Sequence, residues 1–178
     1  MAVIGLLALV ACRRDSVTHV RVPKAQPVRP AALQSAAPVA GSKLGWTLPR
    51  GWTEALSGGM RYATLKPAVP GRIEATVVVL PGPAGGELGN VNRWRGQLGL
   101  PPVDESALAS VRETHSTKIG PVSVFDFRNE ERSSRVIVAM AMADGNSWFF
   151  KMTGDLEPVS TAKPEFVRLL ESLRLEER

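Results

Sequence analysis

The sequence contains very few of the residues that build disulfide and metal sites. Among its 178 residues there is one cysteine, Cys12, and there are two histidines, His19 and His115. A single cysteine excludes a disulfide framework within the chain and a zinc site made of several cysteines. Two histidines far apart in sequence do not make a histidine-rich site either. We therefore expect neither a metal nor a cofactor.

Motifs that mark common catalytic and nucleotide-binding sites are missing as well. The sequence contains no G-x-S-x-G serine elbow, no G-x-G-x-x-G loop, no H-E-x-x-H helix and no Walker loop. No group of residues stands out as a catalytic set. We therefore expect a protein that is not an enzyme.

The positive charge is confined to one end of the chain. The formal net charge is +5, from 22 Lys and Arg against 17 Asp and Glu. Residues 1–43 contain six basic residues and a single acid, Asp15, so the rest of the chain is electrically balanced. A nucleic-acid-binding domain usually carries its basic residues on a face of the fold. This distribution argues against nucleic acid as a partner.

Large apolar side chains are missing from the same end. All ten aromatic residues lie at or after Trp46, while residues 12–43 are rich in Ala, Pro, Val and Arg. Such a composition cannot bury enough apolar surface to offset the entropy lost on ordering. We expect a Pro/Ala/Arg-rich linker over 12–43 and a globular domain over 44–178.

Residues 2–11 form an almost wholly apolar run that ends at Cys12. Ten residues make a helix of about 15 Å, half the thickness of a bilayer core, so the run is too short to span a membrane. Its length is typical of the apolar part of a signal peptide, although no basic residue precedes it. The sequence Leu9-Val10-Ala11-Cys12 resembles the bacterial lipobox. We expect 1–11 to be a lipoprotein signal peptide and Cys12 to carry the lipid; the alternative is a buried apolar stretch with an incidental cysteine.

Hydrophobic periodicity predicts an α+β domain with a mainly antiparallel sheet. The expected strands cover 61–66, 72–80, 111–118, 121–128, 134–143 and 146–153, after a short strand and turn within 44–52. Helices are expected over 87–98, near 104–110 with Asp104 as N-cap, and over 161–173. The Asp144-Gly145 pair predicts a tight hairpin.

The strand over 134–143 is apolar on both faces, which is typical of a central strand. One face carries valine and methionine, and the other carries Ile137 and three alanines. Because alanine is small, a bulky element can approach that face closely. The helix over 161–173 is the expected partner, with Thr161 as its cap and Pro164 in its first turn.

The predicted helix over 87–98 carries the densest group of polar residues. Asn90, Arg93 and Gln97 recur at helical spacing next to Trp94, and Asn92 lies between them. An arginine beside a tryptophan and amides is suited to a carboxylate, a phosphate or a partner protein. The Gly85-Gly86 pair before the helix could expose backbone amides to an anion. The alternative is that Asn90 caps the helix, Arg93 and Gln97 are solvated and Trp94 is core.

A second candidate group lies in the strand over 146–153. Trp148 is expected to share a face with Phe150 and Met152, while Phe149 and Lys151 point the other way. A lysine beside aromatic rings is either a binding residue or a cover for an apolar surface.

The segment Asn90-Val-Asn-Arg-Trp-Arg-Gly-Gln-Leu-Gly-Leu-Pro-Pro102 resembles a group of uncharacterised bacterial envelope lipoproteins, which carry an NxNRWRxQ helix after a Gly-rich turn. The stretch from Trp148 to Asp155 and the closing Phe-x-x-Leu-Leu helix fit the same group. The order of elements is similar to the PsbP/Mog1-like fold, in which helices pack on a sheet. This resemblance implies no known activity and transfers no catalytic residue. The PsbP-like proteins are accessory or binding proteins, and this is an analogy of fold alone.

These observations predict a lipid-anchored protein of the bacterial cell envelope that acts as a non-enzymatic binding or accessory module. Its expected partners are the membrane, through the N-terminal lipid, and an envelope protein. The alternative is an envelope enzyme, or a protein for small anionic ligands, with a site built around Arg93 and Lys151.

Overall fold

The structure is a computed structural model, and it describes residues 43–176. The predictions for 1–11, for Cys12 and for the linker up to residue 42 lie outside these residues. The described residues form nine strands and three helices in this order: β1 Lys43–Gly45, β2 Thr53–Leu56, β3 Arg61–Lys66, β4 Ile73–Pro81, α1 Glu87–Gln97, α2 Glu105–Val111, β5 Arg112–Thr117, β6 Gly120–Asn129, β7 Ser134–Ala143, β8 Asn146–Asp155, α3 Leu156–Glu171 and β9 Arg174–Glu176.

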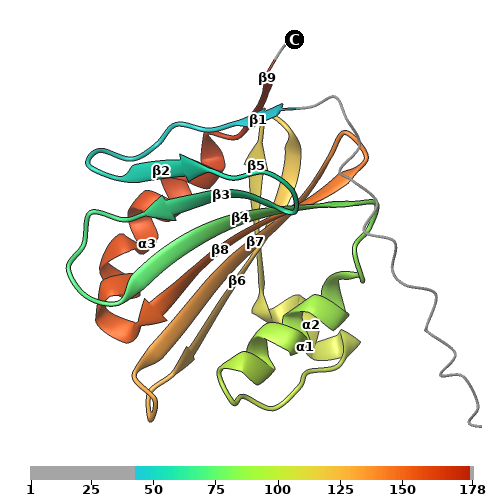
Figure 1. Ribbon diagram of the computed structural model, residues 1–178. Helices are drawn as coiled ribbons and strands as arrows, with labels where there is room; N and C mark the ends of the chain where they lie inside the picture. Colours follow the sequence, from blue (N-terminus) through green and yellow to red (C-terminus); the bar gives the residue numbers. More distant parts are fainter. Residues whose placement is uncertain (1–42, 177–178) are drawn as a thin grey trace, which may run out of the picture. The chain divides into compact units, whose positions relative to one another are not determined.

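A seven-stranded antiparallel sheet forms the centre of this part of the chain (Figure 1). Its strand order is β2-β3-β4-β8-β7-β6-β5, while β1 and β9 pair with each other separately. The expected α+β class with a mainly antiparallel sheet is confirmed. Strands β5 to β8 form the expected meander, and β8 also pairs with β4, about seventy residues earlier in sequence.

Both faces of the sheet are buried, because α3 covers one face and α1 with α2 cover the other (Figure 1). The alternation of β7 places Ile137 and Ala139 in the core under α3, and Val136 and Val138 in the core under α1. The prediction that the final helix packs on the alanine face is confirmed. The rings of β8 divide in the same way, with Phe150 under α3 and Phe149 under α1.

The start of α3 was predicted wrongly. The helix begins at Leu156 with Asp155 at the N-cap position, so Thr161 is not its cap and Pro164 lies inside it. Pro164 has no amide hydrogen and removes one helical hydrogen bond. The apolar stripe begins earlier than expected, with Val159 and Ala162 fully buried. Burial along this stripe outweighs the lost bond, so the helix continues through the proline.

The helix α2 begins as expected. The side chain of Asp104 accepts a hydrogen bond from the amide of Ala107 at 2.8 Å, which is the usual N-cap contact. Strands β2 and β9 were not predicted. Every residue of β2 is exposed, and β9 has three residues, so neither shows an apolar alternation.

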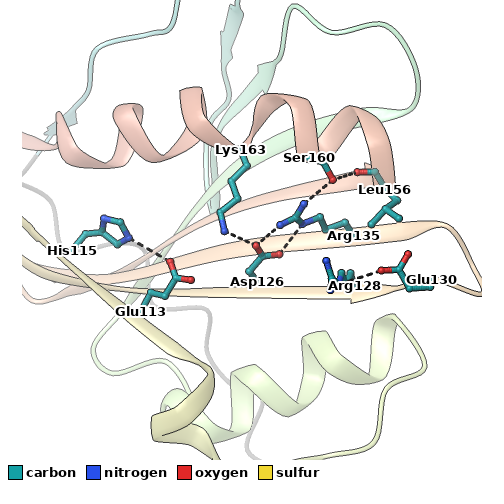
Figure 2. Close-up of polar contacts among 9 residues, drawn as sticks. All are labelled: Glu113, His115, Asp126, Arg128, Glu130, Arg135, Leu156, Ser160 and Lys163. Atoms are coloured by element: carbon teal, nitrogen blue, oxygen red, sulfur yellow. Dashed lines mark hydrogen bonds and ion pairs between the residues drawn. The ribbon is translucent and has the colours of Figure 1, made fainter.

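An ion network joins α3 to the sheet (Figure 2). The guanidinium of Arg135 in β7 donates from Nε and Nη2 to the two carboxylate oxygens of Asp126 in β6, at 2.8 and 2.5 Å. Lys163 of α3 donates to the same carboxylate at 2.7 Å, and Arg135 also donates to the hydroxyl of Ser160 at 2.7 Å. Burial alone would raise the pKa of Asp126, but the hydrogen bonds and charges of Arg135 and Lys163 together lower it.

We expect Asp126→Asn to lower the free energy of unfolding by about 3 kcal/mol at pH 7, because it leaves two partly buried cations without their anion. The pKa of Asp126 is lowered on folding, so its stabilisation is present above about pH 3.9 and is lost as the pH falls below that value. Urea unfolding of the full chain at pH 7 and pH 3 should therefore show a smaller difference between wild type and variant at pH 3. An equal difference at both pH values would contradict the ionic role.

Candidate functional site

A pocket of about 210 Å³ opens on the face of the sheet that α1 covers. Its walls come from four elements that lie far apart in sequence. The lining residues are Arg61 of β3, Thr76, Val78 and Leu80 of β4, Asn90, Arg93 and Trp94 of α1, and Phe149 and Lys151 of β8. Three of these carry a positive charge, and no acidic side chain among the described residues lines the pocket.

Strand register builds the floor of the pocket. Thr76 lies opposite Lys151 and Val78 lies opposite Phe149 in the pairing of β4 with β8. In the pairing of β3 with β4, Arg61 lies opposite Val78. Directly opposed residues of antiparallel strands point to the same face, so these five side chains share the surface beside α1.

Helix α1 supplies the wall and the best-held cation. Trp94 is buried, with its ring 6.1 Å from the ring of Phe149. Asn90 is 2% exposed and donates to the carbonyls of Ala84 and Gly86 at 2.9 and 2.7 Å. The same amide accepts a hydrogen bond from Nη1 of Arg93 at 2.9 Å. Asn90 therefore positions the guanidinium of Arg93 at the pocket.

Lys151 lies half-buried on the strand floor of the pocket. Burial lowers the pKa of Lys151, the charge of Arg61 lowers it further, and Glu74 acts in the opposite direction. Its Nζ lies 3.5 Å from Oε1 of Gln97. Glu74 forms an ion pair with Arg61 at 3.7 Å, with both side chains more than half exposed. The positive charge of the lining is thus offset only weakly.

The predicted site residues divide into two groups. Asn90, Arg93, Trp94 and Lys151 come together in the pocket, and Gln97 lies at its edge beside Lys151. Asn92 and Trp148 lie outside the pocket.

Asn92 makes two hydrogen bonds with the backbone of Val103, at 2.9 and 2.8 Å, and thereby ties α1 to the segment before α2. Trp148 is 1% exposed in the core under α3, on the opposite face of the sheet. Both side chains hold the fold together, and neither lines the pocket.

Sequence reasoning missed Arg61 and Thr76. Thr76 lies opposite Lys151 in the pairing of β4 with β8, and no local sequence pattern indicates that pairing. Gly85 and Gly86, which were considered as a site for an anion, do not line the pocket. The first residue of α1 is Glu87, which forms an ion pair with Arg112, so a carboxylate already lies in the first helical turn.

The described residues contain no group of three or more His, Cys, Asp or Glu side chains that is arranged to hold a metal ion. His115 lies 3.8 Å from Glu113 and 3.5 Å from Glu171, measured between side-chain nitrogen and oxygen. None of the three helices of residues 43–176 is both long and apolar enough to cross a bilayer.

No protein-family model matches the sequence, and no curated protein matches it. Solved structures with a similar fold include cyanobacterial PsbP (CyanoP) from Synechocystis, with 13% identity, a TM-score of 0.47, and coverage of 81% of this chain and 99% of that chain. LpqN, involved in cell envelope biogenesis of Mycobacterium tuberculosis, has 13% identity, a TM-score of 0.46, and coverage of 77% and 85%.

A protein from Bacteroides thetaiotaomicron has 14% identity, a TM-score of 0.43, and coverage of 76% of this chain and 46% of that chain. These similarities concern the fold and assign no residue and no activity. Because no family model matches this chain, the resemblance of residues 90–102 to envelope lipoproteins stays a prediction.

Proposed function

We propose that this chain is a lipid-anchored binding module of the bacterial envelope, and that its pocket beside α1 binds an acidic group of its ligand. The observation that carries the proposal is the convergence of Arg61, Arg93 and Lys151, from three different elements, on one pocket. A carboxylate or phosphate in the pocket would supply the negative charge that the described lining lacks. It would also offset the repulsion between the charges of Arg61 and Lys151, which adds to the effect of burial in lowering the pKa of Lys151.

Each polar group of the pocket has a distinct role in this proposal. The guanidinium of Arg93 offers paired donors that match two oxygens of a carboxylate or phosphate. The hydrogen bond to Asn90 holds it in place before the ligand arrives, which reduces the entropy lost on binding. Lys151 acts as a compact charge that can follow the ligand, and Thr76 adds a hydroxyl.

The lining favours binding over catalysis. Acid–base catalysis needs a group that exchanges a proton near neutral pH, and nucleophilic catalysis needs a base beside the nucleophile. The described lining offers one hydroxyl, that of Thr76, with no histidine, cysteine or carboxylate beside it, and in this proposal Lys151 opposite Thr76 holds the charge of the anion. Its cations are suited to holding an anion.

We expect the full chain to bind inorganic phosphate or acetate saturably, as measured by calorimetry or by NMR shifts of the Trp94 indole. Arg93→Gln and Lys151→Gln should each weaken binding about tenfold or more, which corresponds to about 1.4 kcal/mol. The matched control is Arg168→Gln, because this arginine lies on α3 with its side chain 66% exposed. Absence of binding to both anions, or an equal loss in Arg168→Gln, would contradict the proposed site.

The anchor is a separate part of the proposal and rests on the sequence alone. A lipid on Cys12 would leave the Pro-rich segment as a tether between the membrane and the domain. We expect Cys12→Ser to abolish acyl labelling in a bacterial host and to release the protein from the membrane fraction. Acyl labelling that persists in the variant would contradict lipidation at Cys12.

A further inference from the structure

The pocket beside α1 has an apolar half as well as a cationic half. Val78 and Leu80 of β4 line it together with the rings of Trp94 and Phe149. The two ring residues are almost fully buried, with exposed fractions of 6% and 7%. Val78 and Leu80 are only half-buried, so apolar surface remains accessible in the pocket itself.

The two halves are adjacent because they belong to the same strands. Along β4, Thr76 lies in the cationic half, and Val78 and Leu80 follow at the two-residue spacing of one strand face. Along β8, Lys151 lies two residues from Phe149. One molecule in the pocket therefore meets charge at one end and apolar side chains a few ångström away.

An inorganic anion would use only half of these contacts. The apolar half gains free energy when water leaves it, and only a ligand with an apolar part can displace that water favourably. The volume of about 210 Å³ is below the roughly 300 Å³ at which pockets for drug-sized ligands begin. The pocket thus suits an acidic headgroup that is joined to a small apolar group.

We propose that the natural ligand of this pocket is a small amphiphilic acid, with a carboxylate or phosphate held by Arg93 and Lys151 and an apolar group, of about one ring, against Val78 and Leu80. This inference rests on the proposed function, because it specifies the ligand of the same site. The apolar group supplies affinity, and the acidic group fixes the orientation of the ligand.

Three probes separate the two halves of the pocket. Phenyl phosphate has both groups, methyl phosphate has the acid alone, and phenol has the ring alone. We expect the full chain to bind phenyl phosphate at least tenfold more tightly than either of the other two. Phenyl phosphate should also shift the NMR signal of the Trp94 indole more than that of Trp52, which lies in the core under α3.

Variants of each half complete the test. Val78→Thr keeps the shape of the side chain and replaces a methyl group by a hydroxyl, so it should reduce the preference for phenyl over methyl phosphate at least threefold. Arg93→Gln should weaken both phosphates. The control is Val69→Thr, because Val69 is also half-buried but packs on the opposite core. Circular dichroism of each variant verifies that it is folded.

Two failures are distinguishable. If both phosphates bind with equal affinity, or if Val78→Thr leaves the preference unchanged, the amphiphilic ligand is wrong and the acid-binding site stands. If neither phosphate binds the wild type, the proposed function fails and this inference fails with it.

Discussion

Replacing Gly154 by alanine should lower the free energy of unfolding by more than about 4 kcal/mol, or prevent folding altogether. A Cβ atom at this position would overlap the backbone carbonyl oxygen of Arg72 and lie 2.8 Å from the Cα atom of Ile73. Both obstacles are backbone atoms, so no side-chain rotation relieves the overlap. The chain at Gly154 can therefore accept only a residue without a side chain.

The overlap falls where β4 and β8 are hydrogen-bonded. Gly154 lies opposite Ile73 in β4 and opposite Arg135 in β7, and the amide of Asp155 donates to the carbonyl of Arg72 at 2.8 Å. Moving the backbone away would break bonds between central strands of the sheet. The pocket beside α1 is built on the same pairing, so the variant should also lose anion binding.

The control for Gly154→Ala is Gly96→Ala in α1. Apart from its chain neighbours and the backbone of its own helix, no atom lies within 4 Å of a Cβ built at Gly96, and alanine is a better helix former than glycine. Gly96→Ala should raise the free energy of unfolding by up to about 1 kcal/mol. Urea unfolding of the full chain, followed by circular dichroism, compares the two variants. A Gly154→Ala protein as stable as wild type would show that the β4–β8 contact is not as close as described.

Replacing Leu169 by alanine should lower the free energy of unfolding by about 2–5 kcal/mol. Leu169 is 1% exposed in the middle of the stripe by which α3 packs on the sheet. Strand β7, on which α3 packs, contributes small side chains to the same core, among them Ala139 and Ala141. Small neighbours cannot move into the space that the leucine leaves, so a cavity persists and its cost adds to the lost burial.

Leu56→Ala makes the same chemical change at an exposed site. Leu56 lies in the edge strand β2 and is 70% exposed. Its replacement should change stability by no more than about 0.5 kcal/mol. Comparing the urea midpoints of the two variants separates the effect of burial from the effect of replacing any leucine by alanine. Equal midpoints would contradict the packing of α3 on the sheet.

Local sequence determined those features that short-range geometry can set. The Asp144-Gly145 pair predicted the β7–β8 hairpin, and both residues have positive φ, 46° and 74°, as a tight two-residue turn requires. Strand β7 is apolar on both faces whatever lies beside it, so its central place followed from its composition. The spacing of apolar residues that predicts helix α1 lies within the helix itself. Asn90, Arg93 and Trp94 could therefore be proposed as neighbours from spacing alone.

Long-range pairing decided the rest. Nothing in β4 or β8 by itself indicates that Thr76 lies opposite Lys151, because many registers bury similar apolar surface and only the packed sheet selects one. Strand β2 carries no buried residue and is a strand only because β3 pairs with it. Pro164 remains inside α3 because burial against the sheet outweighs a helical hydrogen bond. The pocket beside α1 depends on these pairings. Its individual cations can be read from the sequence, but only the tertiary structure brings them together.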